Sequence, residues 1–320
     1  MNILVTGSSG FIGSNLINFI KNDFTSIVGI DNHNSVVYKK RYKSFRNDFL
    51  KEITNFKEFN LDLSNKDSFE KVIIENSINL IIHLAAHPGV RLSKQIPNIY
   101  IDNNINNFIN VIDIACRHNL KFIYASSSSV YNSEINSIPF KEDSQNFKPD
   151  SIYGITKYSN ELIADLYFQK NNFKSVGLRF FSVYGEMGRP DMAIMSFIES
   201  ILNKKNISLN NNGETLRDYT SVKTVIEIIR RISLQFEKIK GHNIYNIGNT
   251  KPIKTVEILN FLIKISGKTS PTISNFKVNE QPATFADISK ISLEFGPLME
   301  IDIFDELPLI YNWAITNRYI

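Results

Sequence analysis

Near the start of the chain stands the segment ILVTGSSGFIG, residues 3–13, in which an apolar run is followed by glycines at every third position. The run Ile3–Thr6 is typical of a parallel strand covered on both faces, and a helical pattern begins at Ser14. Glycines at such a strand-to-helix turn allow a tight bend, a close approach of the backbone to a pyrophosphate, and close helix packing. The helix N-terminus then faces the negative charge. The segment predicts a dinucleotide-binding turn, although similar turns also occur without a ligand.

The same alternation of strand and helix continues through the first half of the chain. Further apolar runs lie at Ile27–Asp31, Glu58–Leu63, Leu80–Ala86, Phe122–Ser127 and Val176–Phe181. Helical patterns lie between them, at Ser14–Lys21, Lys66–Asn76, Ile99–His118 and Tyr153–Lys170. This repetition predicts an α/β fold with a Rossmann-like, doubly wound parallel sheet.

After Gly185 the alternation of expected strands and helices becomes less regular. We expect two further helices, two short strands and a turn, at Met192–Lys204, Val222–Phe236, Ile207–Leu209, Asn243–Ile247 and Asn210–Gly213. The C-terminal part of the sequence contains glycines and prolines that interrupt helices and strands, as is typical of a smaller, loop-rich cap. These residues are Gly267, Pro271, Pro282, Gly296, Pro297 and Pro308. We therefore expect a Rossmann domain over residues 1–185, with residues 217–248 packing back on it, and a smaller C-terminal domain over residues 186–320.

Composition excludes several classes of protein. The chain has 320 residues, 42% of them hydrophobic and 21% charged, which is typical of a globular protein rather than a disordered or fibrous one. The net charge is only +4, and we interpret Lys39–Lys43 as a solvated loop, so no nucleic-acid partner is expected. A single cysteine, Cys116, rules out a disulfide framework and a cysteine-based metal site. No apolar run approaches the roughly 18 residues that cross a bilayer, so we expect a soluble, cytoplasmic protein.

Acidic and small residues follow the next strands. Asp31 closes the second run, 18 residues after Gly13. An acid at this distance accepts hydrogen bonds from the adenosine ribose and repels a 2′-phosphate, so NAD is favoured over NADP. Asp62 is expected either to contact the adenine or to cap the next helix. The small residues Leu84–Ala86 suit a backbone that passes close to a diphosphate.

A second signal is the pair Tyr153 and Lys157, which are four residues apart and share one face of the expected helix. An ammonium beside a tyrosine stabilises the phenolate and lowers its pKa, which makes the phenolate a usable base near neutral pH. Such pairs are common by chance. However, the run Ser126–Ser129 stands at the end of the fifth expected strand, where open parallel sheets bind their ligands. A hydroxyl there can bridge the tyrosine oxygen and a reacting sugar hydroxyl.

These motifs, in this order, resemble the extended branch of the short-chain dehydrogenase/reductase superfamily, and within it the nucleotide-sugar epimerases. The resemblance covers nearly the whole chain and rests on Gly7-x-x-Gly10-x-x-Gly13, Asp31, His83–Ala86, Asn104, Ser127–Tyr131, Tyr153-x-x-x-Lys157, Arg179–Gly185, Arg217–Thr220 and Ala286–Lys290. It implies catalytic roles for Tyr153, Lys157 and Ser127. It also implies NAD as cofactor, bound by Gly7, Gly10, Phe11, Ile12, Gly13, Asp31, Asp62, Leu63, Leu84, Ala85, Ala86, Asn104, Tyr153 and Lys157.

Two stretches, Ala86–Arg91 and Gly188–Ala193, resemble the UDP-glucuronate 4-epimerases. The resemblance implies conversion of UDP-glucuronate to UDP-galacturonate through a 4-keto intermediate, with residues 186–320 mainly binding the nucleotide sugar. It implies that the sugar carboxylate is lined by Ser128, Ser129, Ser182 and Arg189, that Arg217 contacts the diphosphate, and that His87 and Arg91 lie at the substrate. It implies a homodimer as well, built from the helices expected at Ile99–His118 and Tyr153–Lys170.

Some positions depart from the family pattern. Glu186 stands where proline is usual after Tyr-Gly, Asn132 where glycine is usual, and Lys223–Thr224 where an acidic pair is usual. Because Glu186 puts a carboxylate near the expected sugar pocket, a neutral UDP-sugar such as UDP-glucose, UDP-N-acetylglucosamine or a UDP-pentose stays open as the substrate. A non-catalytic NAD-binding protein is a further alternative. Elimination chemistry is not expected, because Ser128 and Ser129 stand where related dehydratases carry an acid.

Overall fold

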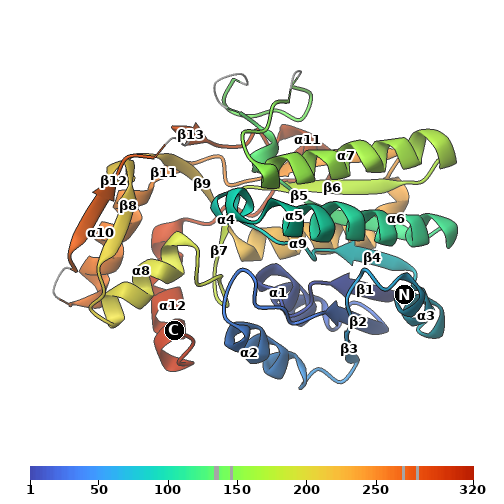
Figure 1. The fold of residues 1–320 in the computed structure, drawn as a ribbon, viewed down its shortest axis with the longest axis horizontal. Coiled ribbons are helices and arrows are strands. Elements are labelled where there is room, and N and C mark those ends of the chain that lie inside the picture. Colours follow the sequence, from blue (N-terminus) through green and yellow to red (C-terminus); the bar gives the residue numbers. More distant parts are fainter. Residues whose placement is uncertain (133–136, 145–146, 269–270, 279–280) are drawn as a thin grey trace. The chain divides into compact units, whose positions relative to one another are not determined.

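The computed structural model describes residues 1–132, 137–144, 147–268, 271–278 and 281–320 (Figure 1). The chain divides into two compact units. The first unit comprises Met1–Tyr131, Phe147–Phe180 and Ile226–Tyr245, and the second comprises Asn132–Asn146, Phe181–Val225 and Asn246–Ile320.

The first unit is built on one sheet. Among the described residues this sheet has seven strands in the order β10-β6-β5-β4-β1-β2-β3, and the pairs from β6 to β3 are parallel. The chain order reverses between β1 and β4, which is the switch point of a doubly wound sheet. The predicted fold class is therefore confirmed. The strands are β1 Asn2–Thr6, β2 Ser26–Asp31, β3 Phe56–Asn60, β4 Leu80–His83, β5 Lys121–Ser127, β6 Ser175–Phe180 and β10 His242–Ile247.

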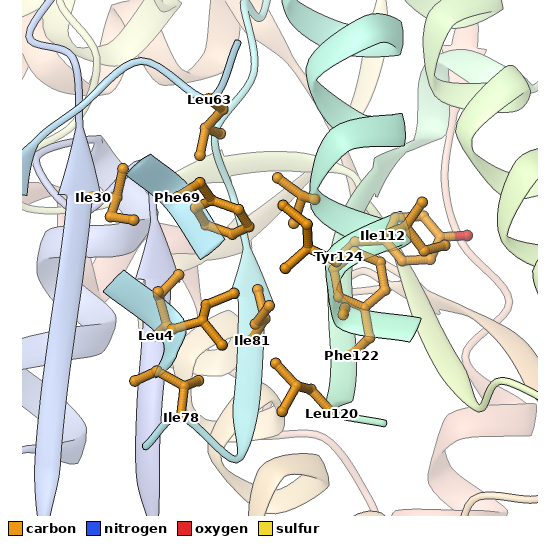
Figure 2. Packing of buried hydrophobic residues seen from close by; sticks show 14 of the residues in the cluster. Leu4, Ile30, Leu63, Phe69, Ile78, Ile81, Ile112, Leu120, Phe122 and Tyr124 are labelled. Carbon is orange, nitrogen blue, oxygen red and sulfur yellow. The ribbon is translucent and has the colours of Figure 1, made fainter. Parts of the chain in front are cut away.

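Helices cover the sheet on both faces. Figure 2 shows Phe69 of α3 and Ile112 of α6 in one layer with strand residues such as Ile81, so α3 and α6 lie on the same face. Helix α7 runs beside α6 there, and its Ala164 belongs to the same core (Figure 1). Right-handed crossovers place α1 and α2 on the opposite face. These helices are α1 Phe11–Ile20, α2 Lys40–Leu50, α3 Lys66–Glu75, α4 Val90–Gln95, α5 Pro97–Ile101, α6 Asn107–Arg117, α7 Ile152–Asn171 and α9 Val222–Leu234.

The interpretation of Lys39–Lys43 as a solvated loop was wrong. Helix α2 begins at Lys40, and Lys43 forms an ion pair of 2.9 Å with Asp31. The buried residues of α2 are Tyr42, Arg46 and Leu50, which recur every four residues. Because an arginine occupies the middle of this buried stripe, the apolar pattern that predicts a helix is interrupted.

Several expected ends were also misplaced. Strand β3 ends at Asn60 and β4 at His83, so the apolar residues up to Leu63 and Ala86 lie in the following loops. The helix expected at Ile99–His118 is present as one continuous run over residues 97–117, in which a π-helical segment at Asp102–Asn106 joins α5 to α6. Apolar residues near the sheet edge stay buried beyond the strand, as Leu63 does, and for this reason hydrophobicity alone overestimates strand length.

The second unit contains two small sheets and four helices among its described residues. One sheet has the order β11-β9-β13 with β7 also paired to β9, and the other pairs β12 with β8. Its tail is more regular than expected, because Gly267 and Gly296 end helices and Pro308 lies inside one. The elements are β7 Ser182–Tyr184, α8 Ala193–Leu202, β8 Ile207–Asn210, β9 Leu216–Ser221, β11 Pro252–Lys254, α10 Thr255–Ser266, β12 Ile273–Phe276, β13 Ala283–Thr284, α11 Ser289–Phe295 and α12 Ile303–Thr316.

A buried carboxylate joins three segments of the second unit. Asp218 of β9 accepts hydrogen bonds from the backbone N–H groups of Asn249, Thr250 and Ala286, and from the hydroxyl of Thr220. Burial raises the pKa of Asp218 although these bonds oppose the shift. Within the described ranges, every helix is too short or too polar to cross a bilayer.

Candidate active site

The glycine-rich turn lies between β1 and α1 at the switch point of the sheet. A Cβ atom on Gly13 would stand 2.2 Å from the carbonyl oxygen of Gly7, so only glycine lets α1 pack this closely on the turn. The backbone N–H of Gly7 donates to the carbonyl of Ile30, which fixes the turn on β2. The N-cap residue of α1 is Gly10, which has no side chain to occupy the helix N-terminus. Phe11 and Ile12 open this helix. The turn therefore has the shape that a pyrophosphate requires.

Two acids follow the neighbouring strands. Asp31 ends β2 and accepts hydrogen bonds from the Lys43 ammonium at 2.9 Å and from the backbone N–H of His33 at 2.8 Å. Asp62 accepts from Asn32 at 2.7 Å and from the N–H of Ser64 at 2.9 Å. Burial alone would raise the pKa of Asp62, but these bonds outweigh it and the pKa is lowered. Helix α3 is capped by Asn65 rather than by Asp62.

The loop after β4 is held by a buried amide. Asn104 accepts a hydrogen bond from the N–H of His87 at 2.7 Å and donates to the His87 carbonyl at 3.0 Å. It also donates to Thr156 of α7 at 3.2 Å. Asn104 is the buried residue of the π-helical segment Asp102–Asn106, and π-helical turns are frequent at functional sites. The side chain expected to bind cofactor therefore links the loop at His87 to α7.

The residues expected to be catalytic come from α7 and β5. Tyr153 lies in the first turn of α7, whose N-cap Ser151 accepts from the N–H of Gly154. One turn later, Lys157 is buried and donates to the carbonyl of Ala125 on β5 at 2.8 Å. Burial lowers the pKa of Lys157 to about 8, and the charge of Glu161 opposes that shift. Ser127 ends β5, and its hydroxyl accepts from the N–H of Ser129 at 3.1 Å.

A glycine brings α7 onto the end of β5. A Cβ atom at Gly154 would stand 2.2 Å from the carbonyl oxygen of Ser129. The first turn of α7 therefore rests directly on the segment Ser127–Ser129. Because Lys157 is bonded to Ala125 on the same strand, the first turns of α7 are held beside the end of β5, which carries Ser127.

We expect Gly154→Ala to lower kcat by roughly tenfold, because α7 must move away from Ser129 and a shift of about 1 Å is enough to misalign reacting groups. The thermal midpoint and kcat are both measured. The control is Lys170→Ala, which removes an exposed side chain at the other end of the same helix and leaves the contact intact. Full kcat in Gly154→Ala would show that the close approach does not set the geometry.

A buried ion pair links α7 to β6 next to these residues, and the sequence analysis did not predict it. Glu161 accepts from the hydroxyl of Ser126 at 2.5 Å and from the guanidinium of Arg179 at 2.8 and 2.7 Å. Arg179 also donates to the phenol of Tyr131 at 2.7 Å. The signal was available, since Glu161 stands four residues after Lys157 on the same helix face. Through the bond from Ser126 to Glu161, this ion pair fixes the end of β5.

Two histidines flank the site in different roles. His83 is buried against Thr6, with 2.8 Å between its Nδ1 and the Thr6 hydroxyl, and burial lowers its pKa to about 3. His87 is packed edge-on against Tyr100, which in turn packs edge-on against Tyr153. Burial lowers the pKa of His87 to about 4, so both rings are neutral at pH 7. Arg91, on α4, is exposed.

The remaining residues expected at the substrate are divided between the units. Ser128 and Ser129 form a 3-10 turn in the first unit, whereas Ser182, Arg189 and Arg217 belong to the second. Ser182 begins β7. Arg189 forms a bidentate ion pair with Asp191, and Arg217 donates to backbone carbonyls of Leu216 and Gln281.

Glu186 is a half-buried acid of the second unit. Burial raises its pKa, and the charge of Glu306 adds to this shift while that of Lys223 opposes it. In the part of the chain that the structure describes, no three His, Cys, Asp or Glu side chains are grouped in a way that would hold a metal ion.

Comparison with known proteins agrees with this geometry. The model of the NAD dependent epimerase/dehydratase family matches residues 3–248. The protein MJ1055 of Methanocaldococcus jannaschii is 38% identical over 99% of this chain and 97% of its own length. A UDP-glucuronate 4-epimerase of Thermodesulfobacterium geofontis is 34% identical over 98% of this chain and 96% of its own length. The crystal structure of the Bacillus cereus UDP-glucuronic acid 4-epimerase, in complex with UDP-glucuronic acid and NAD, is 33% identical, with a TM-score of 0.91 over 99% of both chains.

Proposed function

Because the chain belongs to the NAD dependent epimerase/dehydratase family, we propose that it is an NAD-dependent 4-epimerase of UDP-sugars that interconverts UDP-glucuronate and UDP-galacturonate. The observation that carries this proposal is the likeness, over 99% of both chains, to an enzyme solved with UDP-glucuronic acid and NAD. Relatives named for UDP-glucuronate favour this substrate over neutral UDP-sugars. The presence of both Tyr153 and Lys157 on α7, together with Ser127 at the end of β5, favours an enzyme over a non-catalytic NAD-binding protein.

The first unit fits the dinucleotide. The turn at Gly7–Gly13 suits the pyrophosphate, and Asp31 stands where the adenosine ribose hydroxyls are bound in such folds. NAD held there would supply the acceptor, and later the donor, of the hydride at C4 of the sugar. Asp62, Leu63 and residues 84–86 lie in loops at the same edge of the sheet and are assigned to the adenosine and diphosphate.

The proton is handled by Tyr153. Its phenolate removes the proton of the C4 hydroxyl as the 4-keto sugar forms, and the phenol returns it after the sugar has turned over. Lys157 supplies the positive charge that stabilises the phenolate, and its bond to the Ala125 carbonyl holds the ammonium in place. Ser127 bridges the phenol and the sugar hydroxyl, because it ends the strand on which α7 rests.

The sugar carboxylate requires its own binding groups. A 4-keto uronic acid is a β-keto acid, which loses carbon dioxide when the scissile bond aligns with the carbonyl π system. We assign its orientation to Ser128, Ser129, Ser182 and Arg189, since donors aimed at a charge in a dry site are strong. A guanidinium can bind a carboxylate with two parallel hydrogen bonds. Arg189 makes such a pair with Asp191 in this structure, so the assignment requires the sugar carboxylate to replace Asp191 when the substrate binds.

We expect Arg189→Met to raise the KM for UDP-glucuronate at least tenfold, because a charged hydrogen bond is worth about 1.5–3 kcal/mol. The KM for UDP-glucose should change less than twofold. Steady-state kinetics with both sugars measure the difference. Equal losses on the two sugars would contradict the assignment of Arg189 to the carboxylate.

The function itself is tested by incubating the purified protein with UDP-glucuronate or with UDP-glucose and separating the products by chromatography. UDP-galacturonate from the first sugar, at a rate above that of UDP-galactose from the second, supports the proposal. Equal or faster turnover of UDP-glucose would overturn the choice of substrate, and no turnover of any UDP-sugar would overturn the enzyme assignment.

We further propose that the protein is a homodimer. Helix α7 exposes Ile155, Leu162 and Leu166, each about half accessible, on one face. Ile99 and Ile101 of the neighbouring helix α5 are also exposed. An apolar patch of this kind on adjacent helices is typical of an interface between proteins.

We expect the double substitution Leu162→Glu and Leu166→Glu to give a monomer, because two charges cannot be buried between apolar helix faces without partners. Light scattering after size exclusion measures the mass. The control is Leu293→Glu, at an exposed leucine of α11 in the second unit, which should leave the mass unchanged. A wild-type protein that is already monomeric would contradict the proposed dimer.

A further inference from the structure

The glycine-rich turn is hydrogen-bonded to the carboxylate of Glu58, which is not among the residues assigned to the site. Ser8 and Ser9 are both fully buried, and their hydroxyls donate to the same oxygen of Glu58 at 2.5 and 2.8 Å. Glu58 belongs to β3, which is separated from β1 by β2. Its neighbour in the register is Gly29 of β2, which has no side chain to stand between Glu58 and the turn.

The other oxygen of Glu58 lies 3.0 Å from Nε2 of His33, and both side chains are only 10% exposed. Because a carboxylate only accepts hydrogen bonds, His33 is the donor. His33 has a left-handed backbone conformation, with φ of 48°, and its N–H donates to Asp31. Glu58 therefore connects the turn suited to the pyrophosphate with the segment that carries Asp31, the acid assigned to the adenosine ribose.

A cation is also bonded to the same turn. Arg46 is fully buried, and its guanidinium donates to the carbonyl of Ser9 at 3.4 Å and to the phenol of Tyr38 at 2.9 Å. The peptide Ser8–Ser9 is thus fixed by an anion at its hydroxyls and by a cation at its carbonyl. This arrangement leaves the turn little freedom to change shape.

We propose that Glu58 is a positioning residue for the dinucleotide. Through Ser8, Ser9 and His33 it fixes the distance between the glycine-rich turn and Asp31, the acid assigned to the adenosine ribose, and thereby slows release of NAD. This inference rests on the proposed function. An epimerase that returns the hydride to the same sugar needs a cofactor that stays bound throughout, and groups set in advance at the spacing of the ligand lose less freedom on binding. A residue that only filled space would change stability without changing the rate of NAD release.

The test compares Glu58→Ala, Glu58→Gln and the double variant Ser8→Ala with Ser9→Ala, and uses Glu52→Ala as the control because Glu52 is exposed just after α2. Three quantities are measured on each full-length protein. These are the rate at which NAD is released after gel filtration, kcat at saturating NAD, and the thermal midpoint.

We expect Glu58→Ala and the double variant to release NAD about tenfold faster or more, since hydrogen bonds to a charged group are involved. The Glu58→Gln variant should fall between them and the wild type, because its amide oxygen still accepts from the serines. Saturating NAD should restore kcat to within twofold, and the control should match the wild type throughout.

Wild-type release rates in all of the Glu58 and serine variants, with only the thermal midpoint lowered, would overturn this inference. If Glu58→Ala does not fold, the double serine variant decides the question, because it keeps the carboxylate and its bond to His33. Failure of the wild type to bind NAD would instead contradict the proposed function, so the two failures are distinguishable.

Discussion

Replacing Tyr153 by phenylalanine should lower the epimerisation of UDP-glucuronate by about 10³-fold, within the range that a general acid–base group contributes. The substitution removes only the phenolic oxygen. The ring keeps its edge-on packing against Tyr100, and the N–H of residue 153 keeps its bond to Ser93. We therefore expect the thermal midpoint and the amount of bound NAD to stay at their wild-type values. The rate is measured by separating the two uronic acid nucleotides.

The matched control for this substitution is Tyr158→Phe on the same helix. Tyr158 packs its ring against Phe147, with 5.3 Å between centroids, and takes no part in the site. Its activity should be within twofold of the wild type. Tyr153→Phe at more than a tenth of the wild-type rate would show that another group moves the proton, and the roles of Lys157 and Ser127 would then have to be reassigned.

The sequence predicted the sheet well because the signals were local. Buried parallel strands appear in the sequence as short apolar runs, and the run at residues 3–6 followed by Gly7, Gly10 and Gly13 predicts the strand-to-helix turn between β1 and α1. Tyr153 and Lys157 were found for the same reason, since a spacing of four places them on one helix face. Ser127 was added to them because ligands of open parallel sheets bind at the carboxyl ends of the strands.

What the sequence did not predict depends on contacts between distant segments. Glu58 appears as an ordinary strand residue, and only the register of β3 against β2 brings its carboxylate under Ser8 and Ser9. Arg46 interrupts the apolar stripe of α2, and its role is visible only when the carbonyl of Ser9 is placed beside it. Buried polar residues of this kind interrupt the hydrophobic pattern of a helix or strand. The residues that position the site therefore cannot be identified from that pattern.

Lys157→Met should abolish most activity, by about 10²-fold or more, because the phenolate loses its neighbouring charge. The same substitution should leave the NAD-free protein as stable as the wild type or more stable at pH 7. Burial lowers the pKa of Lys157 from 10.5 to about 8, so its charge destabilises the folded state by about 3 kcal/mol. Methionine removes that cost, and part of the gain is lost because the Ala125 carbonyl loses its donor.

The dependence on pH distinguishes this cost from an effect of packing. Below pH 8 the lysine is protonated in both the folded and the unfolded chain, so its destabilising effect is present in full. Between pH 8 and 10.5 the folded chain binds fewer protons than the unfolded chain, and the stability of the wild type therefore rises with pH relative to the variant. Urea unfolding of both proteins at pH 7 and pH 10 measures the difference. A difference in stability that is the same at both pH values would contradict the buried charge, and with it the view that this site trades stability for an activated phenol.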